Sequence, residues 1–317
     1  MRPVVALLDA RPETIAADYR RLLELAQLAP PDGPARLVAD GGPGTWLPGA
    51  VSPPWQLAGC LAGSAPGGEV HVVGRPVAGL WDRVLAEAGA GLAEPAARAD
   101  HPVRSQALVP TLAAVRPRGL AVPAGLAGGG ALLLPVPTVG RGWPVAGAVA
   151  LLLRLLVPAP VRPRRFPLAE LAAEAVALAR QTLQPRGAVL DGTVWQVRGG
   201  ALERWPAGRN VLIAGADPVA VDAVACRLAG ADPRRVPWLR LCSERGLGEG
   251  RLERIRLAGQ AELLDLDFGL PERTLVAADR LPGRRPLADL VYNLTRRPAA
   301  LRGHRSTPWG RLAAARR

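Results

Sequence analysis

Lysine is absent from this sequence, and all 40 of its basic residues are arginine. The formal net charge is +13 and the sequence pI is about 11.3, a balance that in general suggests nucleic acid or an anionic membrane as a partner. Here the abundance of Ala, Gly and Pro beside Arg indicates the codon usage of a GC-rich bacterial genome. We therefore expect a surface decorated with arginine, and we rank direct nucleic-acid binding well behind other functions.

Cysteines are scarce, and the three that occur are Cys60, Cys226 and Cys242. They are far apart and form no Cys-x-x-Cys pair, which excludes a zinc knuckle or an iron–sulfur run built from local spacing. We therefore expect no iron–sulfur cluster. Cys226 and Cys242 fall on predicted helices, where they are most simply small buried hydrophobic residues.

Long apolar runs are also missing. The longest, Val145–Val157, is interrupted by Arg154 and is well short of the roughly 20 residues that a membrane span needs. The apolar run near the amino terminus, Val4–Leu8, is too short for the core of a signal peptide. We expect a soluble cytoplasmic protein without a transmembrane segment. Its hydrophobic content of 49% permits a sizeable core.

Strand and helix patterns alternate from the first residue onward. Short apolar runs bounded by turn residues predict strands, and apolar residues spaced for one helix face predict the helices between them. This order predicts an α/β fold with a mainly parallel, doubly wound sheet and helices on both faces, arranged as two Rossmann-like lobes. In the amino-terminal third the predicted strands are 4–8, 35–39 and 69–73, and the predicted helices begin at Pro12, Trp55 and Val77.

The pattern also divides the chain. A linker rich in Pro and Arg separates two predicted α/β lobes, and an arginine-rich peripheral tail follows the second; the four parts are 1–157, 158–166, 167–270 and 271–317. Residues 89–129 have only weak periodicity. In the first lobe we further predict a buried strand over Gly130–Val136, a loop over Pro137–Pro144 and a helix over Val145–Val157.

The second lobe has the sharpest signals. A helix over Pro167–Leu183 precedes a strand over Gly187–Leu190, and a further strand spans Asn210–Ala214. Asp217 then has the chemistry of a helix N-cap and Pro218 suits the first helical position. Later elements of this lobe are a stop at Gly230, a helix over 236–244 and an edge strand over 255–258.

Polar residues follow three of the predicted strands, where parallel sheets bind their ligands. If these strands are parallel neighbours, their ends converge on one crevice. The guanidinium of Arg141 suits a carboxylate or phosphate, so we expect a small anionic ligand. Asp191 and Asp222 are candidate catalytic acid and base, or ligands of a divalent metal. The candidate ligand-binding residues are Thr138, Arg141, Thr193 and Asp217.

Each acidic candidate also has a structural alternative. Asp217 is first of all a helix cap. Asp191, in Asp-Gly-Thr, is also a turn former. Asp222 lies in the second turn of its helix, where it can favour the helix dipole or pair with an arginine. The sequence leaves these alternatives open, together with the identity of any metal.

The segment Ile213–Ala225 reads Ile-Ala-Gly-Ala-Asp-Pro-Val-Ala-Val-Asp-Ala-Val-Ala and resembles the signature of the domain of unknown function 362 family. The segments Leu228–Pro233 and Glu244–Gly248 continue the resemblance in order. Elements of one branch of that family, without the ferredoxin-like domain, resemble Ser52–Leu57, Leu134–Val139, Asp191–Thr193 and Ser306–Leu312. The resemblance implies an α/β fold but no reaction.

The departures from that family concern polar residues. Where the branch has Trp-His this chain has Trp46-Leu47, and where it has Lys-Thr-His this chain has Gly140-Arg141-Gly142. Packing residues remain, which implies a divergent paralogue that has altered or lost its activity. Such a protein would act as a scaffold, as a homo-oligomer or with an intact family member. A third reading is a surface binder of nucleic acid or anionic membrane through the arginine-rich tail.

Overall fold

The protein was analysed as a computed structural model. The described residues are 2–28, 36–40, 69–73, 86, 91–92, 98–101, 120–123, 126, 129–135, 137–140, 143–156, 168–196, 206–268, 308–309 and 311.

An eight-stranded sheet in the order β12-β1-β11-β10-β7-β2-β3-β4 forms the centre of the molecule. Every strand except β11 runs in the same direction, since β11 pairs antiparallel with both β1 and β10. The mainly parallel α/β sheet is therefore confirmed. Its strands are β1 Val4–Asp9, β2 Arg36–Asp40, β3 Glu69–Val73, β4 Gly91–Leu92, β7 Leu132–Leu134, β10 Gly187–Gln196, β11 Pro206–Gly215 and β12 Arg256–Gly259.

Two separate hydrophobic clusters cover the two faces of this sheet. Side chains alternate between the faces along a strand, and in β1 Val5 and Leu7 belong to one cluster while Ala6 and Leu8 belong to the other. Both faces are buried, which explains why β1 reads as a continuous apolar run rather than an alternating one. We call the face with Val5 and Leu7 the α7 face, and the opposite one the α1 face.

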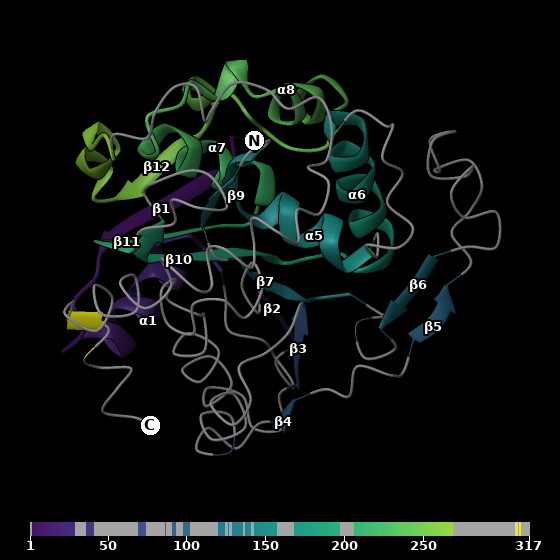
Figure 1. The fold of residues 1–317 in the computed structure, drawn as a ribbon, viewed down its shortest axis with the longest axis horizontal. Helices are drawn as coiled ribbons and strands as arrows, with labels where there is room; N and C mark the ends of the chain where they lie inside the picture. Colours follow the sequence, from purple (N-terminus) through teal and green to yellow (C-terminus); the bar gives the residue numbers. More distant parts are fainter. Residues whose placement is uncertain are drawn as a thin grey trace, which may run out of the picture.

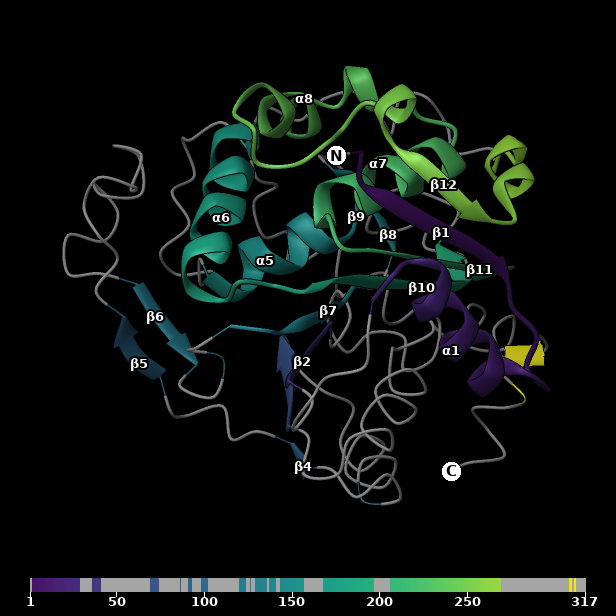
Figure 2. The ribbon, with the colours of Figure 1, turned by 180° about the vertical axis from the view of Figure 1, so that it is seen from behind.

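The helices are divided unequally between the faces, as Figures 1 and 2 show. On the α1 face, helix α1 (Ile15–Leu25) buries Ile15, Tyr19 and Leu22, the stripe that its periodicity predicts. The α7 face carries a larger layer, made of α5 Ala148–Leu156, α6 Leu168–Thr182, α7 Pro218–Leu228 and α8 Pro237–Glu244. The residues of α5 are apolar and buried on nearly all sides of the helix, as expected for a helix inside a layer.

The segment predicted as a loop over Pro137–Pro144 is instead part of a β-hairpin. Strands β8 (Thr138–Gly140) and β9 (Trp143–Ala146) pair antiparallel as a separate two-stranded sheet. The predicted helix over Val145–Val157 consequently begins later, at Ala148. β9 takes Val145 and Ala146 because β-branched and aromatic residues beside Pro144 favour extended backbone.

The strands β10 and β11 are much longer than predicted, with ten residues each. Asp191-Gly192-Thr193 therefore lies inside β10 and not after it, at a place where the register shifts between Gly192 and Val194. The lengthening leaves only residues 197–205 between the strands. A parallel connection needs a dozen residues or more, so β11 returns antiparallel, and the expectation that it is parallel to its neighbours is wrong.

The sheet draws strands from both predicted lobes, and β1 lies between β11 and β12. The division at the linker 158–166 stays a prediction, because that segment lies outside the described residues. So do the helix predicted from Trp55 and nearly all of the one predicted from Val77. Within 89–129 the structure describes β4 and a second two-stranded sheet of β5 (Arg98–His101) and β6 (Leu120–Pro123).

One part of the predicted peripheral tail is packed against the core. Trp309 is 2% exposed and belongs to the cluster on the α1 face, and its indole Nε1 donates to Asn210 Oδ1 at 2.7 Å. Among the helices in the described part of the chain, none has both the length and the apolar character required to cross a bilayer.

Candidate functional site

Asp222 binds the start of a neighbouring helix. It lies on α7 and is 1% exposed. Its Oδ1 accepts from the backbone N–H of Ala148 at 2.7 Å, and its Oδ2 accepts from that of Val149 at 2.9 Å. These amides open α5 and have no partner within their own helix. Asp222 is thus an N-cap supplied by another helix, and it fastens α5 to α7.

The close approach of Asp222 depends on Gly147. A Cβ placed on Gly147 would collide with the Asp222 carboxylate, so any other residue there would displace the carboxylate from its position at the start of α5. Burial raises the pKa of Asp222 to about 7, although the two amide hydrogen bonds oppose that shift and the nearby Asp217 adds to it. The carboxylate is held in place by backbone dipoles and not by a cation that the structure describes.

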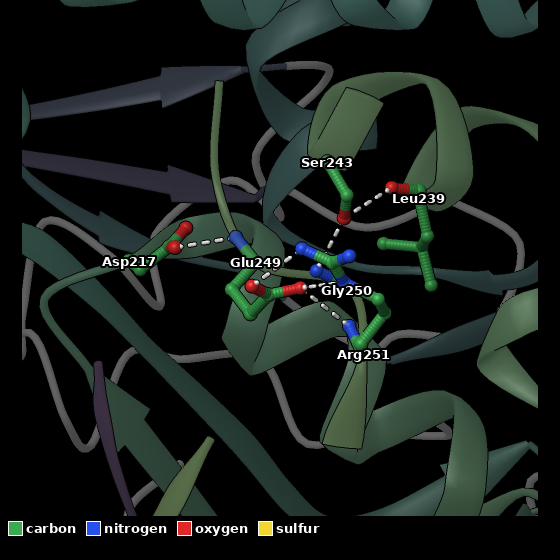
Figure 3. Close-up of polar contacts among 6 residues, drawn as sticks. All are labelled: Asp217, Leu239, Ser243, Glu249, Gly250 and Arg251. Atoms are coloured by element: carbon green, nitrogen blue, oxygen red, sulfur yellow. Dashed lines mark hydrogen bonds and ion pairs between the residues drawn. The ribbon is translucent and has the colours of Figure 1, made fainter. Parts of the chain in front are cut away.

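Asp217 caps α7 itself, as predicted. Its Oδ1 accepts from the amides of Val219 at 2.9 Å and Ala220 at 3.3 Å. Its Oδ2 accepts from the amide of Glu249 at 2.8 Å, which ties the loop after α8 to the start of α7 (Figure 3). Burial raises the pKa of Asp217, while these three amides and the charge of Arg180 act to lower it.

The loop after α8 closes around Asp217 through further polar contacts, drawn in Figure 3. Ser243 Oγ donates to Leu239 O at 3.0 Å and accepts from the amide of Gly250 at 2.7 Å. Glu249 and Arg251 pair within the loop at 2.8 Å. The loop approaches Asp217 so closely that a Cβ on Gly248 would lie 2.6 Å from Asp217 Oδ1. The approach therefore requires a glycine at this position.

Asp191 lies on the other face of the sheet. It is completely buried, and its Oδ2 accepts from the hydroxyl of Tyr19 on α1 at 2.7 Å. Its Oδ1 accepts from both the amide and the hydroxyl of Thr193, at 3.0 and 2.6 Å. The carboxylate therefore fastens α1 to the sheet and stabilises the irregular segment of β10.

The predicted site residues form two groups instead of one. Asp217 and Asp222 lie close enough on the α7 face to influence each other's charge, whereas Asp191 and Thr193 belong to the α1 face. Side chains alternate along β10, so Asp191 shares the face of Val189 and contacts Tyr19 of α1, whereas α7 with Asp222 packs on the opposite face. The antiparallel β11 separates the candidates further along the strands, because Gly215 at its carboxyl end pairs with Ala188 near the amino end of β10.

The remaining two predicted residues follow β7. Thr138 is the first residue of β8, and its Cα pairs with that of Ala146 on β9. Ala146 lies two residues before Ala148, whose amide donates to Asp222. Arg141 lies between β8 and β9 and is outside the described residues. Among the described candidates, Thr138 is thus the one that follows the carboxyl end of β7 along the chain.

Sequence reasoning missed several partners of the acidic residues. Tyr19 lies in the helix predicted from Pro12, and nothing near it in the sequence indicates a carboxylate 172 positions away. Gly147 and the Ser243 contact were missed for the same reason. The segment Glu244–Gly248 did carry a sequence signal for this contact, namely its glycines, because Gly248 permits the close approach to Asp217.

No group of three or more His, Cys, Asp or Glu side chains in the described part of the chain is placed to hold a metal ion. Asp191 and Asp222 cannot share a cation, because they occupy opposite faces of the sheet. Comparison of the sequence with protein-family models, with curated proteins and with solved structures finds no match. The chemistry of the site is therefore argued from its own residues.

Proposed function

We propose that this protein binds a small anionic ligand at the carboxyl edge of its sheet, beside the ends of β2 and β7. The observation that carries the proposal is the strand order. From β2 the chain continues to β3 on one side, and from β7 it continues to β10 on the other. Ligands of open α/β sheets bind where the strand order reverses in this way.

The residues that follow β7 suit an anion. Thr138 supplies a hydroxyl, and Arg141 supplies a planar cation whose parallel N–H groups match a carboxylate or phosphate. The amides of Ala148 and Val149 already donate to Asp222. The start of α5 therefore has these two amides occupied and does not offer them to the ligand. Asp222 instead fixes the start of α5, the helix that follows β9 in the chain.

In this proposal Asp191, Thr193, Asp217 and Asp222 are structural supports. Each oxygen of the three carboxylates accepts at least one hydrogen bond from an amide or hydroxyl of the protein. A divalent metal would bind together with the ligand, because the described carboxylates offer no shared site for one. We retain the proposal that the chain is a divergent member of the domain of unknown function 362 family and a cytoplasmic bacterial protein.

We also propose that the sheet is doubly wound. The crossover from β1 to β2 contains α1, whereas the crossover from β7 to β10 contains α5 and α6, which lie on the opposite face. The two crossovers move along the sheet in opposite directions. Right-handed connections require this exchange of faces when the direction reverses, as in Rossmann-like sheets.

The test is a thermal-shift screen with phosphate, nucleotides, small carboxylates and divalent metals. A ligand that binds only the native state raises the melting temperature. We expect at least one anion to stabilise the parent by a few degrees and to stabilise Arg141→Ala and Thr138→Val much less. Arg240→Ala, a surface arginine paired with Glu244, is the matched control. An equal shift in all four proteins would refute the site.

The second candidate is a non-catalytic scaffold. Its support is that all three acidic residues singled out as functional are engaged by internal structural partners. A scaffold that works as a homo-oligomer should show a concentration-dependent mass in sedimentation equilibrium, and none of the screened ligands should shift its melting temperature. A strict monomer with a stabilising anion would exclude it in favour of the first candidate.

A further inference from the structure

Two hydrogen-bond donors are buried at the far end of the β10–β11 ladder, and the side chains that carry them both contact Phe268. Trp195 Nε1 and Arg209 Nε are both inaccessible to solvent, and neither has an acceptor in the part of the chain that the structure describes. Trp195 is completely buried, whereas the rest of the Arg209 side chain is half-buried. Buried polar groups without a partner are rare and unfavourable, so this pair calls for an acceptor.

The ladder brings the two side chains together. Trp195 on β10 pairs with Ala207 on β11, and Arg209 is two residues further along β11, which places it on the same face of the sheet. That face is the α7 face, because Trp195 packs into its cluster together with Val211. The end of β10 belongs to the carboxyl edge of the sheet, where ligands of such folds bind.

Phe268 holds both donors in position. The rings of Trp195 and Phe268 meet edge to face with their centroids 5.0 Å apart. The Arg209 guanidinium lies 5.0 Å from the centre of the same ring, and its Nη2 donates to Phe268 O at 3.3 Å. The guanidinium is therefore oriented by a cation–π contact and a carbonyl, and no carboxylate among the described residues neutralises it.

We propose that Trp195 and Arg209 form a binding site for a small oxyanion, a carboxylate or a phosphate group. An indole N–H and a guanidinium can only donate, so the missing partner is an acceptor, and the positive charge selects a negative one. The half-buried side of Arg209 provides the approach. The site rests on residues other than those of the proposed function, and the two are independent.

The experiment follows the indole N–H of Trp195 in proton–nitrogen correlation spectra, where the Trp195→Phe spectrum identifies its signal. The parent is titrated with sodium phosphate and, separately, with sodium acetate, at an ionic strength held constant with sodium chloride. We expect a saturable shift of that signal with at least one of the two anions. The arm that saturates at the lower concentration identifies the oxyanion class.

Variants separate binding from a general salt effect. Arg209→Gln is expected to weaken the binding at least tenfold, while the exposed Arg240→Gln leaves it unchanged. Arg209→Lys keeps the positive charge but lacks the planar Nε–H. If this variant binds the anion as tightly as the parent, the role given to Nε is overturned. The same variant tests the proposal if Arg209→Gln does not fold. A non-saturating shift with both anions, or a water cross-peak at the indole N–H without any anion response, would show an ordered water in place of the site.

Discussion

The two faces of the sheet each bury an aspartate, but they satisfy it differently. On the α1 face, Asp191 is bound by the hydroxyls of Tyr19 and Thr193 and by one local amide. On the α7 face, Asp222 is bound, among the residues that the structure describes, by the backbone amides at the start of α5 alone. Both carboxylates fasten a helix to the rest of the core, one through side chains and one through the backbone.

This difference has a consequence for substitutions. The two hydroxyl partners of Asp191, on Tyr19 and Thr193, can be removed one at a time by mutation, and each removal loses one hydrogen bond. The partners of Asp222 cannot be mutated, so a change of Asp222 itself leaves two amides unsatisfied in the interior. We therefore expect the α7 face to be the less tolerant of the two, and the following predictions test that expectation in order of effect.

The largest effect is expected for Asp222→Ala. It removes the only acceptor of the Ala148 and Val149 amides that the structure describes and opens a void beside Gly147, so we expect a loss of about 3 kcal/mol in the free energy of unfolding. Urea denaturation followed by circular dichroism measures it. Asp232→Ala, which removes the exposed cap of a short 3-10 helix, is the control and should lose no more than about 1 kcal/mol. Equal losses would contradict the comparison.

The second effect is a pH dependence. Burial raises the pKa of Asp222 from 3.8 to about 7, so the native state holds a proton that the unfolded chain releases. The stability of the parent relative to Asp222→Asn is then fully present below pH 3.8 and falls as the pH rises to about 7, by up to about 1.4 kcal/mol per pH unit. Unfolding free energies of both proteins between pH 4 and 8 measure the difference. A relative stability that increases over this range would show that the amide hydrogen bonds lower the pKa of Asp222 by more than burial raises it.

A smaller effect is expected at Asp217, where two substitutions separate the cap from the loop contact. Asp217→Ala loses all three amide contacts and should destabilise the protein by about 2 kcal/mol. Asp217→Asn keeps an oxygen for Val219 and Ala220 but presents an N–H₂ to Glu249, and should lose about 1 kcal/mol. Hydrogen exchange then reports faster exchange at Glu249 alone in the Asn variant. Uniformly faster exchange over both segments would mean that cap and loop are inseparable.

The smallest effect is expected for Tyr19→Phe, which removes one donor from Asp191 while the ring stays in the core. We expect a loss of about 1 kcal/mol. The same substitution in an Asp191→Asn background measures the coupling between the two residues by a double-mutant cycle. A loss as large as that of Asp222→Ala would remove the distinction between the faces.

Much of the fold can be predicted from local patterns. The stripe on α1, the cap and first-turn proline of α7, the glycine stop at Gly230 with its φ of +85° and the edge strand β12 all follow from periodicity and turn chemistry. The hairpin β8–β9 was missed, because its glycines and prolines are equally typical of a loop. Cys226 and Cys242 are buried on α7 and α8 as predicted.

The candidate site was predictable only in part. The cap role of Asp217 was recognisable from its immediate neighbours. The partners of Asp191 and Asp222 were not, because Tyr19 and Ala148 are distant in sequence and become neighbours only when the helices pack. The convergence of all the candidates on one crevice failed for two reasons. Asp191 and Thr193 lie inside the lengthened β10, where Asp191 contacts α1, and β11 runs in the reversed direction, which places Asp217 near the amino end of β10.

The sequence by itself therefore determined most of the elements, with their buried faces and the cap of α7, because each of these depends on interactions within a few residues. Only the tertiary structure decided which acidic residue meets which partner. The direction of β11 depends on how much chain remains between two lengthened strands, and the position of Asp222 depends on how α5 packs on α7. Both are set by long-range packing, and the packing of α1 and α7 on the two sides of the sheet leaves Asp191 and Asp222 on opposite faces.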